Sequence, residues 1–570
     1  MSLPDATMTV QDGQLGQVPP SAANASVKTG VCSDGIVGQI YSANDNGTAQ
    51  NSLGQGPLVD AGAQTLDVAG GPVFFLPINP SAAGGLSPAG VLTPIHLGTG
   101  AVAVSFAPRQ SVQIKIILGG INGTATFAIA LGGGTYGPTV TTTSGTFNYP
   151  VPGTLTTITL ASGQTWVLGD VYTIATDGTI TLSGSGPAAS NVTQASSPLD
   201  SYAVQLAITT GGALGVAQFT YSVDGGDAVS GQILVPSSPG KYAIPQTGIV
   251  LTFSSTFTLG DTYTFTTIAA GFSNTDITNA LTTLNASAID FGFVHIVGSN
   301  SGTVEATVAA AAAATTVIID SAMTAAFVGY RFIFAIQECP TLLTTGVAIT
   351  DSALATAFAN TVAMRVSVCA GDAEMASPAN GRIMRRNIAW AYAARLAAIQ
   401  PGQDPGRVKT GALKNVVSIY RDEGNTPILD AARFTTARSH KKKIGYYITN
   451  GNMMAPPGSD YALVQDRRVM DLACGITRAI ELDFLNDDVR TNADGTIYEL
   501  DALAFESTVN NALKAGIVAT GDASSSSVVI SRTQNIASTN TEPVTVRVRK
   551  KAYLKHIQTN MGFAAPSAAA

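Results

Sequence analysis

The chain has 570 residues, of which 45% are hydrophobic and only 12% are charged. Disordered chains combine low hydrophobicity with high net charge, so this composition predicts a folded protein, and the length allows roughly three or four domains. The formal net charge is −7. Nucleic-acid binding requires a basic face that displaces counterions from phosphates, so we expect no direct contact with nucleic acid.

Charged residues divide the chain into two halves. The first 300 residues contain no glutamate and only four of the 30 basic residues. This front half is rich in Gly, Thr, Ser and Val, which is typical of short strands and tight turns. The back half alternates strand-like runs with charged, amphipathic helices. The contrast predicts a β-rich front joined to an α/β back, and it favours an architectural role over catalysis.

Two stretches of the front half resemble each other at a spacing of about 92 residues. Each contains a short strand after a glycine, a Tyr-x-x-Pro segment and a Gly-Asp-x-Tyr turn, at 123–127, 149–152 and 169–172 and again at 215–219, 242–245 and 260–263. Val112, Ile114 and Ile116 alternate with polar residues, as in a half-buried strand. These patterns predict two sandwich-like β modules, at 100–195 and 196–272. Such modules serve as spacers or decoration, or else bind a carbohydrate or receptor.

In the back half, strand-like runs at 291–297, 331–336 and 364–369 alternate with helical segments. This order predicts a parallel sheet with crossover helices. Three amphipathic helices follow. The first carries its apolar stripe over 388–399 and begins near Arg385 and Arg386, the second spans 469–480 with Ser459 as its N-cap, and the third covers 505–513. The expected fold class is an α/β core with a mixed or parallel sheet and flanking helices, all-β sandwich-like insertions, and extended terminal arms.

Several classes of site are not expected. The four cysteines form no C-x-x-C pair, which indicates reduced thiols made in a cytosol and neither a disulfide scaffold nor a zinc site. His295 lies in an apolar strand and is expected to be packed. Asp224 and Asp227 flank a turn that supplies too few ligands for calcium. Without a catalytic motif, we expect no enzyme activity, catalytic residue, metal or cofactor.

We expect no membrane insertion either. Met1 to Val10 contains neither a basic residue nor an apolar run, so no signal peptide is predicted. The alanine-rich run at 309–319 lies between Glu305 and Asp320, which is too short for a span of about 20 residues. This run is therefore predicted to be a buried helix or strand.

Residues of the back half resemble a divergent branch of the contractile tail sheath proteins of bacteriophages. The segments that carry the resemblance are 385–395, 404–408, 429–434, 445–451, 458–461, 466–474 and 497–502. The resemblance covers about residues 275–565. It implies a subunit that polymerises with itself into a helical sleeve around a tail tube and contracts to drive the tube through the host envelope. The implied partners are the tail tube, baseplate and tail terminator proteins, in a virion tail assembled in the host cytoplasm.

The resemblance also assigns parts of the chain to expected roles. We expect an N-terminal arm (1–30), an N-terminal part of the sheath core (31–99), the two insertions, an α/β sheath core (273–525), and C-terminal strands with an arm (526–570). Arg467, Arg468, Arg478 and Glu481 are candidates for a tube or subunit interface. Val544, Val546 and Val548 alternate with polar residues and are candidates for a strand exchanged between subunits. The alternative function is a non-enzymatic adhesin or surface-layer protein that binds ligands through its β modules.

Overall fold

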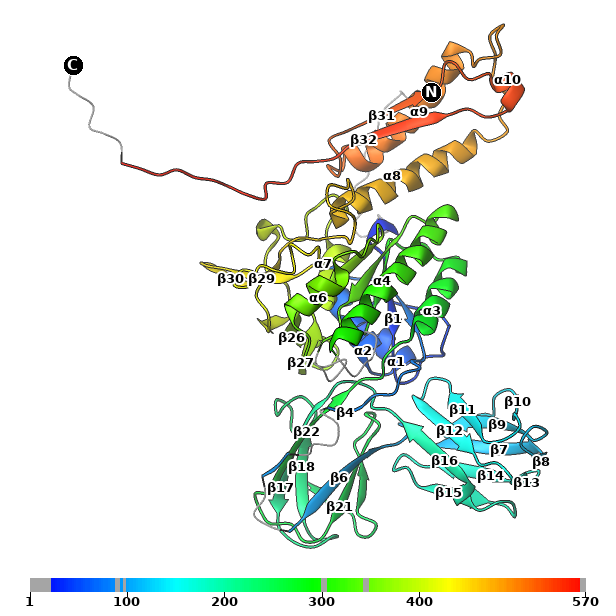
Figure 1. Cartoon of the computed structure of the whole chain (residues 1–570), viewed down its shortest axis with the longest axis vertical. Coiled ribbons are helices and arrows are strands. Elements are labelled where there is room, and N and C mark those ends of the chain that lie inside the picture. The colour runs from blue at the N-terminus through cyan, green and yellow to red at the C-terminus, as the bar shows by residue number, and fades with distance from the viewer. Residues whose placement is uncertain (1–21, 88–92, 96–98, 299–304, 342–347, 564–570) are drawn as a thin grey trace, which may run out of the picture. The chain divides into compact units, whose positions relative to one another are not determined.

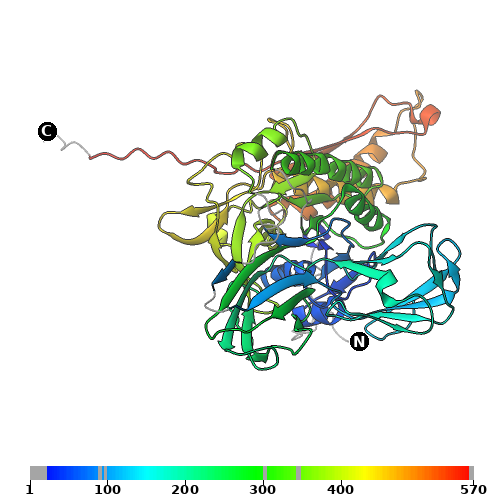
Figure 2. The same cartoon turned by 60° about the horizontal axis from the view of Figure 1, so that its bottom comes forward.

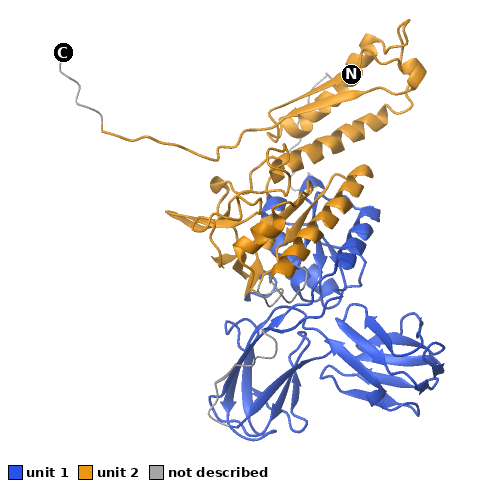
Figure 3. Cartoon of the chain, in the orientation of Figure 1, with its two compact units in different colours: residues 1–301, 377–383, 393–398 blue, residues 302–376, 384–392, 399–570 orange. Residues whose placement is uncertain are grey.

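A computed structural model describes residues 22–87, 93–95, 99–298, 305–341 and 348–563. The chain forms two compact units (Figure 3). Unit 1 comprises residues 1–301, 377–383 and 393–398, and unit 2 comprises 302–376, 384–392 and 399–570. Each contains helices and strands, so the protein is of mixed α/β class with many sheets.

Unit 1 contains a sheet whose central strand lies near the start of the described chain. β1 (Ser26–Gly30) pairs in parallel with β3 (Val73–Pro77) on one side and with β23 (Phe293–Ile296) on the other, and β2 (Tyr41–Ala43) is antiparallel to β3. Every residue of β1 is buried. The expectation that residues 1–30 form a free arm is therefore wrong for 26–30, because the apolar neighbours of β1 come from distant parts of the chain. Residues 1–21 lie outside the described residues.

Helices accompany this sheet. They are α1 (Asn46–Leu53), α2 (Pro57–Ala69) and α3 (Asn274–Ala286). A Cβ on Gly62 of α2 would lie 2.0 Å from the Phe75 ring, so the close approach of α2 to β3 requires glycine there. α3 begins with a capping box in which Ser273 and Asp276 satisfy each other's backbone N–H groups.

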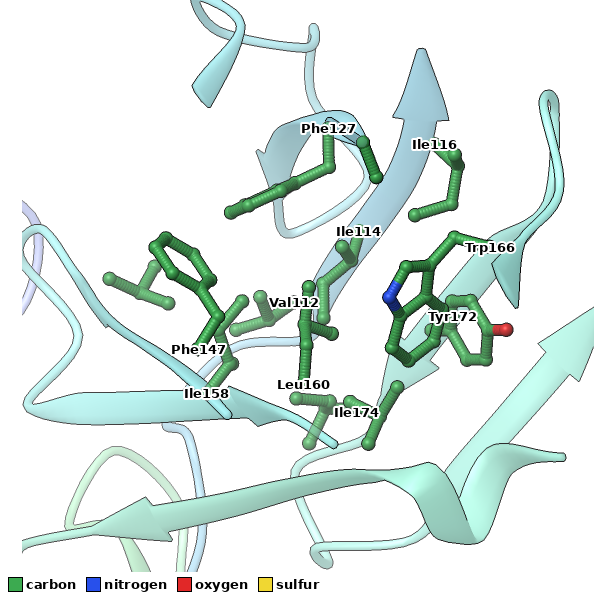
Figure 4. Close-up of a cluster of buried hydrophobic side chains, with 13 residues drawn as sticks. Val112, Ile114, Ile116, Phe127, Phe147, Ile158, Leu160, Trp166, Tyr172 and Ile174 are labelled. Atoms are coloured by element: carbon green, nitrogen blue, oxygen red, sulfur yellow. The ribbon is translucent and has the colours of Figure 1, made fainter. Parts of the chain in front are cut away.

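Unit 1 also contains two β modules (Figures 1 and 2). Module A is continuous in sequence and consists of β7 (Val112–Leu118), β8 (Gly120–Ile121), β9 (Thr126–Leu131), β10 (Val140–Thr141), β11 (Phe147–Val151), β12 (Thr156–Leu160), β13 (Thr165–Trp166), β14 (Val171–Ile174), β15 (Ile180–Ser183) and β16 (Val192–Ser196). Its main sheets have the orders β10-β9-β7-β14-β15 and β11-β12-β16. Val112, Ile114 and Ile116 point into a core with Trp166 and Tyr172, which confirms the alternation read from the sequence (Figure 4).

Module B is interrupted by module A. It consists of β4 (Gly85–Ser87), β5 (Thr93–Ile95), β6 (Ala101–Phe106), β17 (Ala203–Thr210), β18 (Gln218–Ser222), β19 (Ile233–Leu234), β20 (Lys241–Ala243), β21 (Ile249–Ser254) and β22 (Thr262–Ile268). β4 and β5 both pair with β22, and β6 pairs with β21. The expected boundary between core and insertion at residue 100 is therefore wrong, because a repeat read at one spacing does not reveal strands supplied from the other side of an insertion.

The two modules share one arrangement with different chain entry points. The order β19-β18-β17-β22-β4 matches β10-β9-β7-β14-β15, and β20-β21-β6 matches β11-β12-β16. The last strands of module A thus correspond to the first strands of module B, which is a circular permutation. Tyr172 donates its hydroxyl hydrogen bond to the Pro187 carbonyl oxygen at 2.9 Å, and Tyr263 donates the equivalent bond to Gly100 at 3.0 Å.

In unit 2, β24 (Phe334–Glu338) and β25 (Val366–Cys369) are parallel and entirely buried. They are accompanied by α4 (Glu305–Val328) and α6 (Asp351–Phe358). α4 is long and apolar enough to cross a membrane by length and composition alone. Val308, Ala312, Ile319 and Met323 on one of its faces are buried within the protein, as expected for a core helix.

The remaining elements of the α/β region are mostly short strands. They are β26 (Asp372–Ala376), β27 (Ile383–Asn387), β28 (Val416–Ile419), β29 (Ala437–His440) and β30 (Lys443–Ile448), with α7 (Ala389–Ala398) between β27 and β28. Arg385 and Arg386 were expected at a helix start but belong to β27. They are anchored there because the Arg385 guanidinium bonds Asp372 at 2.9 Å and Arg386 lies over the Trp390 ring at 4.7 Å.

Candidate functional site: an open-edged hairpin and its groove

The C-terminal part of unit 2 is a β-hairpin packed on two helices. The helices are α8 (Val464–Asp483) and α9 (Glu499–Leu513), which continues into a π-helical turn (Lys514–Val518). The strands are β31 (Ser525–Ile530) and β32 (Val544–Arg549), joined through the short α10 (Ile536–Thr539). The N-cap of α8 is Leu463, which makes no side-chain cap, so the prediction of Ser459 is wrong. The Ser459 side chain instead accepts a bond from the Tyr461 N–H in a turn.

β31 and β32 run antiparallel, with Ser525 opposite Arg549 and Ile530 opposite Val544. Val544, Val546 and Val548 are half-buried against a core that includes Val469 and Val509 of the helices, while the residues between them are exposed. The predicted half-buried strand is confirmed. Its predicted role as the exchanged arm is not supported in this form, because the three valines already pair and pack within their own chain.

Arg532 fastens the hairpin to α9. Its guanidinium bonds Glu499 and Glu506, each at 2.8 Å, and Glu506 also accepts the Ile530 N–H at 2.8 Å. The hydrogen bonds from Arg532 lower the pKa of Glu506 despite some burial, and the bonds to Glu499 and then to Glu506 raise the pKa of Arg532. No sequence pattern pointed to this clamp, because its partners lie 26 and 33 residues away from Arg532.

The outer edge of β32 is open. In the described part of the chain, β32 pairs only with β31. A strand edge with free N–H and C=O groups can accept a further strand. Two hollows lie beside this edge. One of about 430 Å³ is lined by Val544 and Val546, and one of about 290 Å³ is lined by Val548 and Lys550. Met470 of α8 lines both hollows, and we call the two together the β32 groove.

Two of the four candidate interface residues lie in this groove. Arg478 and Glu481 belong to the α8 stripe that also contains Met470, Cys474 and Thr477, at helical spacing. The Arg478 guanidinium stacks 3.8 Å from the Tyr330 ring centroid, beyond the end of α4. Burial raises the pKa of Glu481, and Arg478 opposes that shift. The wall of the larger hollow is thus mainly apolar and aromatic, with one cation and one carboxylate. The smaller hollow is more polar, and its charged lining residues are Asp460, Asp466, Asp522, Arg549 and Lys550.

The other two candidates, Arg467 and Arg468, are buried within unit 2 and do not lie on its surface. Arg467 is 5% exposed and bonds Asp471 at 2.7 Å, and Asp471 also bonds Arg365 at 3.0 Å. Arg468 is 2% exposed and donates to the Ile399 carbonyl oxygen at 3.3 Å. Burial lowers the pKa of Arg468 to about 10, so it stays charged at neutral pH. These arginines join the N-terminal half of α8 to the α/β region of unit 2.

Beyond β32 the described chain is an arm without helix or strand, residues 550–563. Tyr553 donates to the Gly402 carbonyl oxygen at 3.1 Å, and Lys555 bonds Asp404 and Asn450. Past these anchors, Ile557, Met561 and Phe563 are 76%, 92% and 105% exposed. All three are odd-numbered, so an extended arm would present them on one face.

Asp224 and His295, the residues considered for calcium binding and for packing, both make contacts within the fold. Among the described residues, no group of three or more His, Cys, Asp or Glu could hold a metal ion. Asp224 accepts bonds from Ser222 and the Ala228 N–H and shapes its turn. His295 is fully buried beside Lys28, with its Nδ1 atom 3.5 Å from the ammonium nitrogen. Its complete burial confirms that it is packed, and burial together with that ammonium group lowers the pKa of His295.

Family comparison covers nearly the whole chain. Residues 3–452 match the DUF2586 N-terminal domain, and residues 460–568 match the DUF2586 C-terminal domain. The chain belongs to the DUF2586 family. No curated protein matches this DUF2586 protein.

The solved structures similar to this DUF2586 protein include sheath proteins. The sheath tail protein of Desulfitobacterium hafniense has 13% identity and a TM-score of 0.40, over 96% of this chain and 100% of that chain. The sheath tail protein of Listeria innocua has 10% identity and a TM-score of 0.39, over 92% and 94%. The contracted helical sheath of the anti-feeding prophage has 12% identity and a TM-score of 0.35, over 53% and 78%.

Proposed function

We propose that this protein is a structural subunit of a contractile tail sheath, which polymerises as a helical sleeve around a tail tube and contracts to drive the tube through a host envelope. The observation that carries the proposal is the open edge of β32 beside the larger, mainly apolar hollow, in a chain whose arm at 550–563 exposes apolar side chains. In a monomer the backbone groups of the β32 edge lack a strand partner and the apolar side chains of the arm stay in water. In a polymer the arm of one subunit can pair with the β32 edge of the next.

Strand addition suits a lattice that changes shape. An arm strand paired with β32 of an adjacent subunit would form backbone hydrogen bonds, and Ile557, Met561 and Phe563 would cover one apolar face. The anchors at Tyr553 and Lys555 would hold the base of the arm on its own subunit. The connection would therefore persist while subunits rotate. We propose the same role for the N-terminal arm, now limited to residues 1–21.

The work of contraction would come from inter-subunit contacts. Subunits assembled in an extended, metastable lattice gain contact when the lattice collapses, so release of stored strain replaces a nucleotide or cofactor. In this proposal the protein has no enzymatic activity. Its partners are further copies of itself and the tube, baseplate and tail terminator proteins. It belongs to the virion tail and is assembled in the host cytoplasm.

Electron microscopy of the purified protein tests the proposal. We expect hollow helical tubes, either alone or after addition of the tube protein. Separate particles under all conditions would instead favour an adhesin or surface-layer protein acting through its β modules.

Arm truncation tests the mechanism. Removal of residues 556–570 should leave a folded monomer that builds no stable sleeve. Removal of everything after Asn540 is the contrasting variant, because it deletes β32 and uncovers the core at Val469 and Val509. That variant should unfold at lower temperature. Normal tubes from the 556–570 truncation would show that the C-terminal arm does not connect the lattice.

A further inference from the structure

A basic hairpin protrudes from unit 2 (Figure 1, yellow). β29 and β30 are joined at the bridge between His440 and Lys443, which leaves Lys441 and Lys442 at the tip. The three lysines are exposed, and Ile444 beside them is 96% exposed. The tip therefore presents three cations beside one exposed isoleucine, a surface that a partner of opposite charge can cover.

The tip is not explained by contacts within the chain. Lys441, Lys442 and Lys443 have no ion-pair partner within the ranges that the structure describes. Lys442 has a φ of 68°, a conformation that glycine or asparagine adopts at less cost in such a turn. A lysine is therefore present where the fold alone would favour another residue.

A second surface of unit 2 also has three like charges around an exposed apolar residue, but these charges are negative. The end of α8 and the loop after it expose Asp483, Asp487 and Asp488 around Leu485, which is 67% exposed. These three carboxylates also have no ion-pair partner among the described residues. Leu482 and Val489 beside them are 47% and 40% exposed.

We propose that the Lys441–Lys443 tip of one subunit docks on the acidic 482–489 segment of a second copy of this chain, with Ile444 packing against Leu485. This rests on the proposed polymerisation and adds a specific contact to it, separate from strand exchange. Each surface carries three like charges around an exposed apolar residue. The charges of the two surfaces are opposite, and their apolar residues can meet at the centre of the contact. Nucleic acid is a poorer occupant, because three lysines on a narrow tip do not form a broad basic face.

This contact would set register more than total affinity. Exposed ion pairs are individually weak, but opposite patches steer encounter and penalise wrong pairings. The central Ile444–Leu485 contact would lose water on docking and contribute most of the affinity. Salt screens such charges over about 10 Å at 0.1 M, so the contact should weaken as ionic strength rises.

Charge reversal and charge exchange test the pairing. The basic variant is Lys441→Glu, Lys442→Glu and Lys443→Glu. The acidic variant is Asp483→Lys, Asp487→Lys and Asp488→Lys. The combined variant carries all six changes. We expect each triple variant to lose tube formation by about ten-fold or more, and the combined variant to regain it, because opposite charges then face each other again. Circular dichroism melts establish that the soluble variants fold.

Cross-linking of the wild-type protein supplies a readout that does not depend on variants. Tubes grown from mixed nitrogen-14 and nitrogen-15 subunits are treated with a carbodiimide, which joins lysine to carboxylate at zero length. We expect mixed-isotope links between the 441–443 and 483–488 peptides. Three outcomes would overturn the pairing. The lysines could be linked only to another segment, or the triple variants could assemble normally. The third outcome is that the triple and combined variants fold but are equally defective in assembly. Absence of tubes from the wild-type protein would instead reject the proposed sheath function.

Discussion

Ala82 and Gly271 exchange both of their backbone hydrogen bonds, at N–O distances of 3.1 and 3.0 Å, although both β modules lie between them in sequence. Such an antiparallel pair holds its Cα atoms about 5.5 Å apart. The chain therefore leaves for the modules and returns from them at one point. The two modules together are one insertion, whose first and last residues are held side by side by this pair.

The first prediction concerns excision of both modules. Replacing residues 84–269 by two glycines should leave a folded protein that still assembles, because the Ala82–Gly271 pair closes over a short hairpin loop. Circular dichroism and electron microscopy measure the two outcomes. Excision of 100–272 is the matched comparison. It removes Gly271 and leaves β4 and β5 without β22, so we expect aggregation or a lower melting temperature.

The second prediction is that the modules are not equally removable. Ala107 and Leu199 both donate backbone hydrogen bonds to the Thr247–Gly248 turn, so a short linker can replace residues 108–198. This variant should keep the complete sheets of module B. Removal of 199–270 instead leaves β4, β5 and β6 without their pairing partners β22 and β21. Limited proteolysis followed by mass spectrometry should find a protected module B only in the first variant; equal protection in both would contradict the nesting.

The third prediction separates buried from groove arginines. Arg467→Glu places a second carboxylate beside Asp471 in a buried site, which should lower the free energy of unfolding by about 3–5 kcal/mol. Arg478→Glu is the matched reversal on the half-buried groove wall and should change stability by about 1 kcal/mol or less. Urea denaturation measures both. If Arg478→Glu nonetheless abolishes sleeve formation, the β32 groove is an interface.

The fourth prediction concerns acid. Because the folded-state pKa of Glu506 lies below its ordinary value of 4.5, its stabilising effect is present above pH 4.5 and is lost as pH falls toward the folded-state pKa. Arg532→Gln should cost about 1 kcal/mol at pH 7 and much less in acid, since Glu506 is then protonated in both proteins. Arg547→Gln, an exposed change on β32, is the control. A constant difference across this pH range would mean that the clamp is not electrostatic.

The fifth prediction concerns alkali. Burial raises the pKa of Tyr172 and of Tyr263 to about 12, with Asp170 and Asp261 adding to the shift. Because these values are raised above the ordinary 10.0, the associated stability is complete below pH 10 and is lost as pH rises through 12. Tyr172→Phe and Tyr263→Phe should each cost about 1 kcal/mol at pH 7 through the lost hydrogen bond. Thermal melts should show a shallower alkaline decline in both variants than in the exposed control Tyr136→Phe.

The sequence alone determined the features that depend on local pattern. Alternation placed Val112, Ile114 and Ile116 in a core and left Val544, Val546 and Val548 half-buried, because side chains of a strand point to opposite faces in turn. The spacing of about 92 residues revealed the duplicated module, because corresponding strands of the two copies need similar residues at the same relative positions. The apolar stripe on α8 likewise follows from the period of 3.6 residues per helical turn.

Only the tertiary structure decided the rest, because those features join residues that are distant in sequence. Pairing of β4 and β5 with β22 showed that module B encloses module A, and the neighbours of β1 removed residues 26–30 from the N-terminal arm. Arg467 and Arg478 lie on one helix and look equivalent in sequence. Asp471 and Arg365 bury the first, whereas Tyr330 holds the second in a groove, since burial is decided by what packs against a helix face and not by the helix itself.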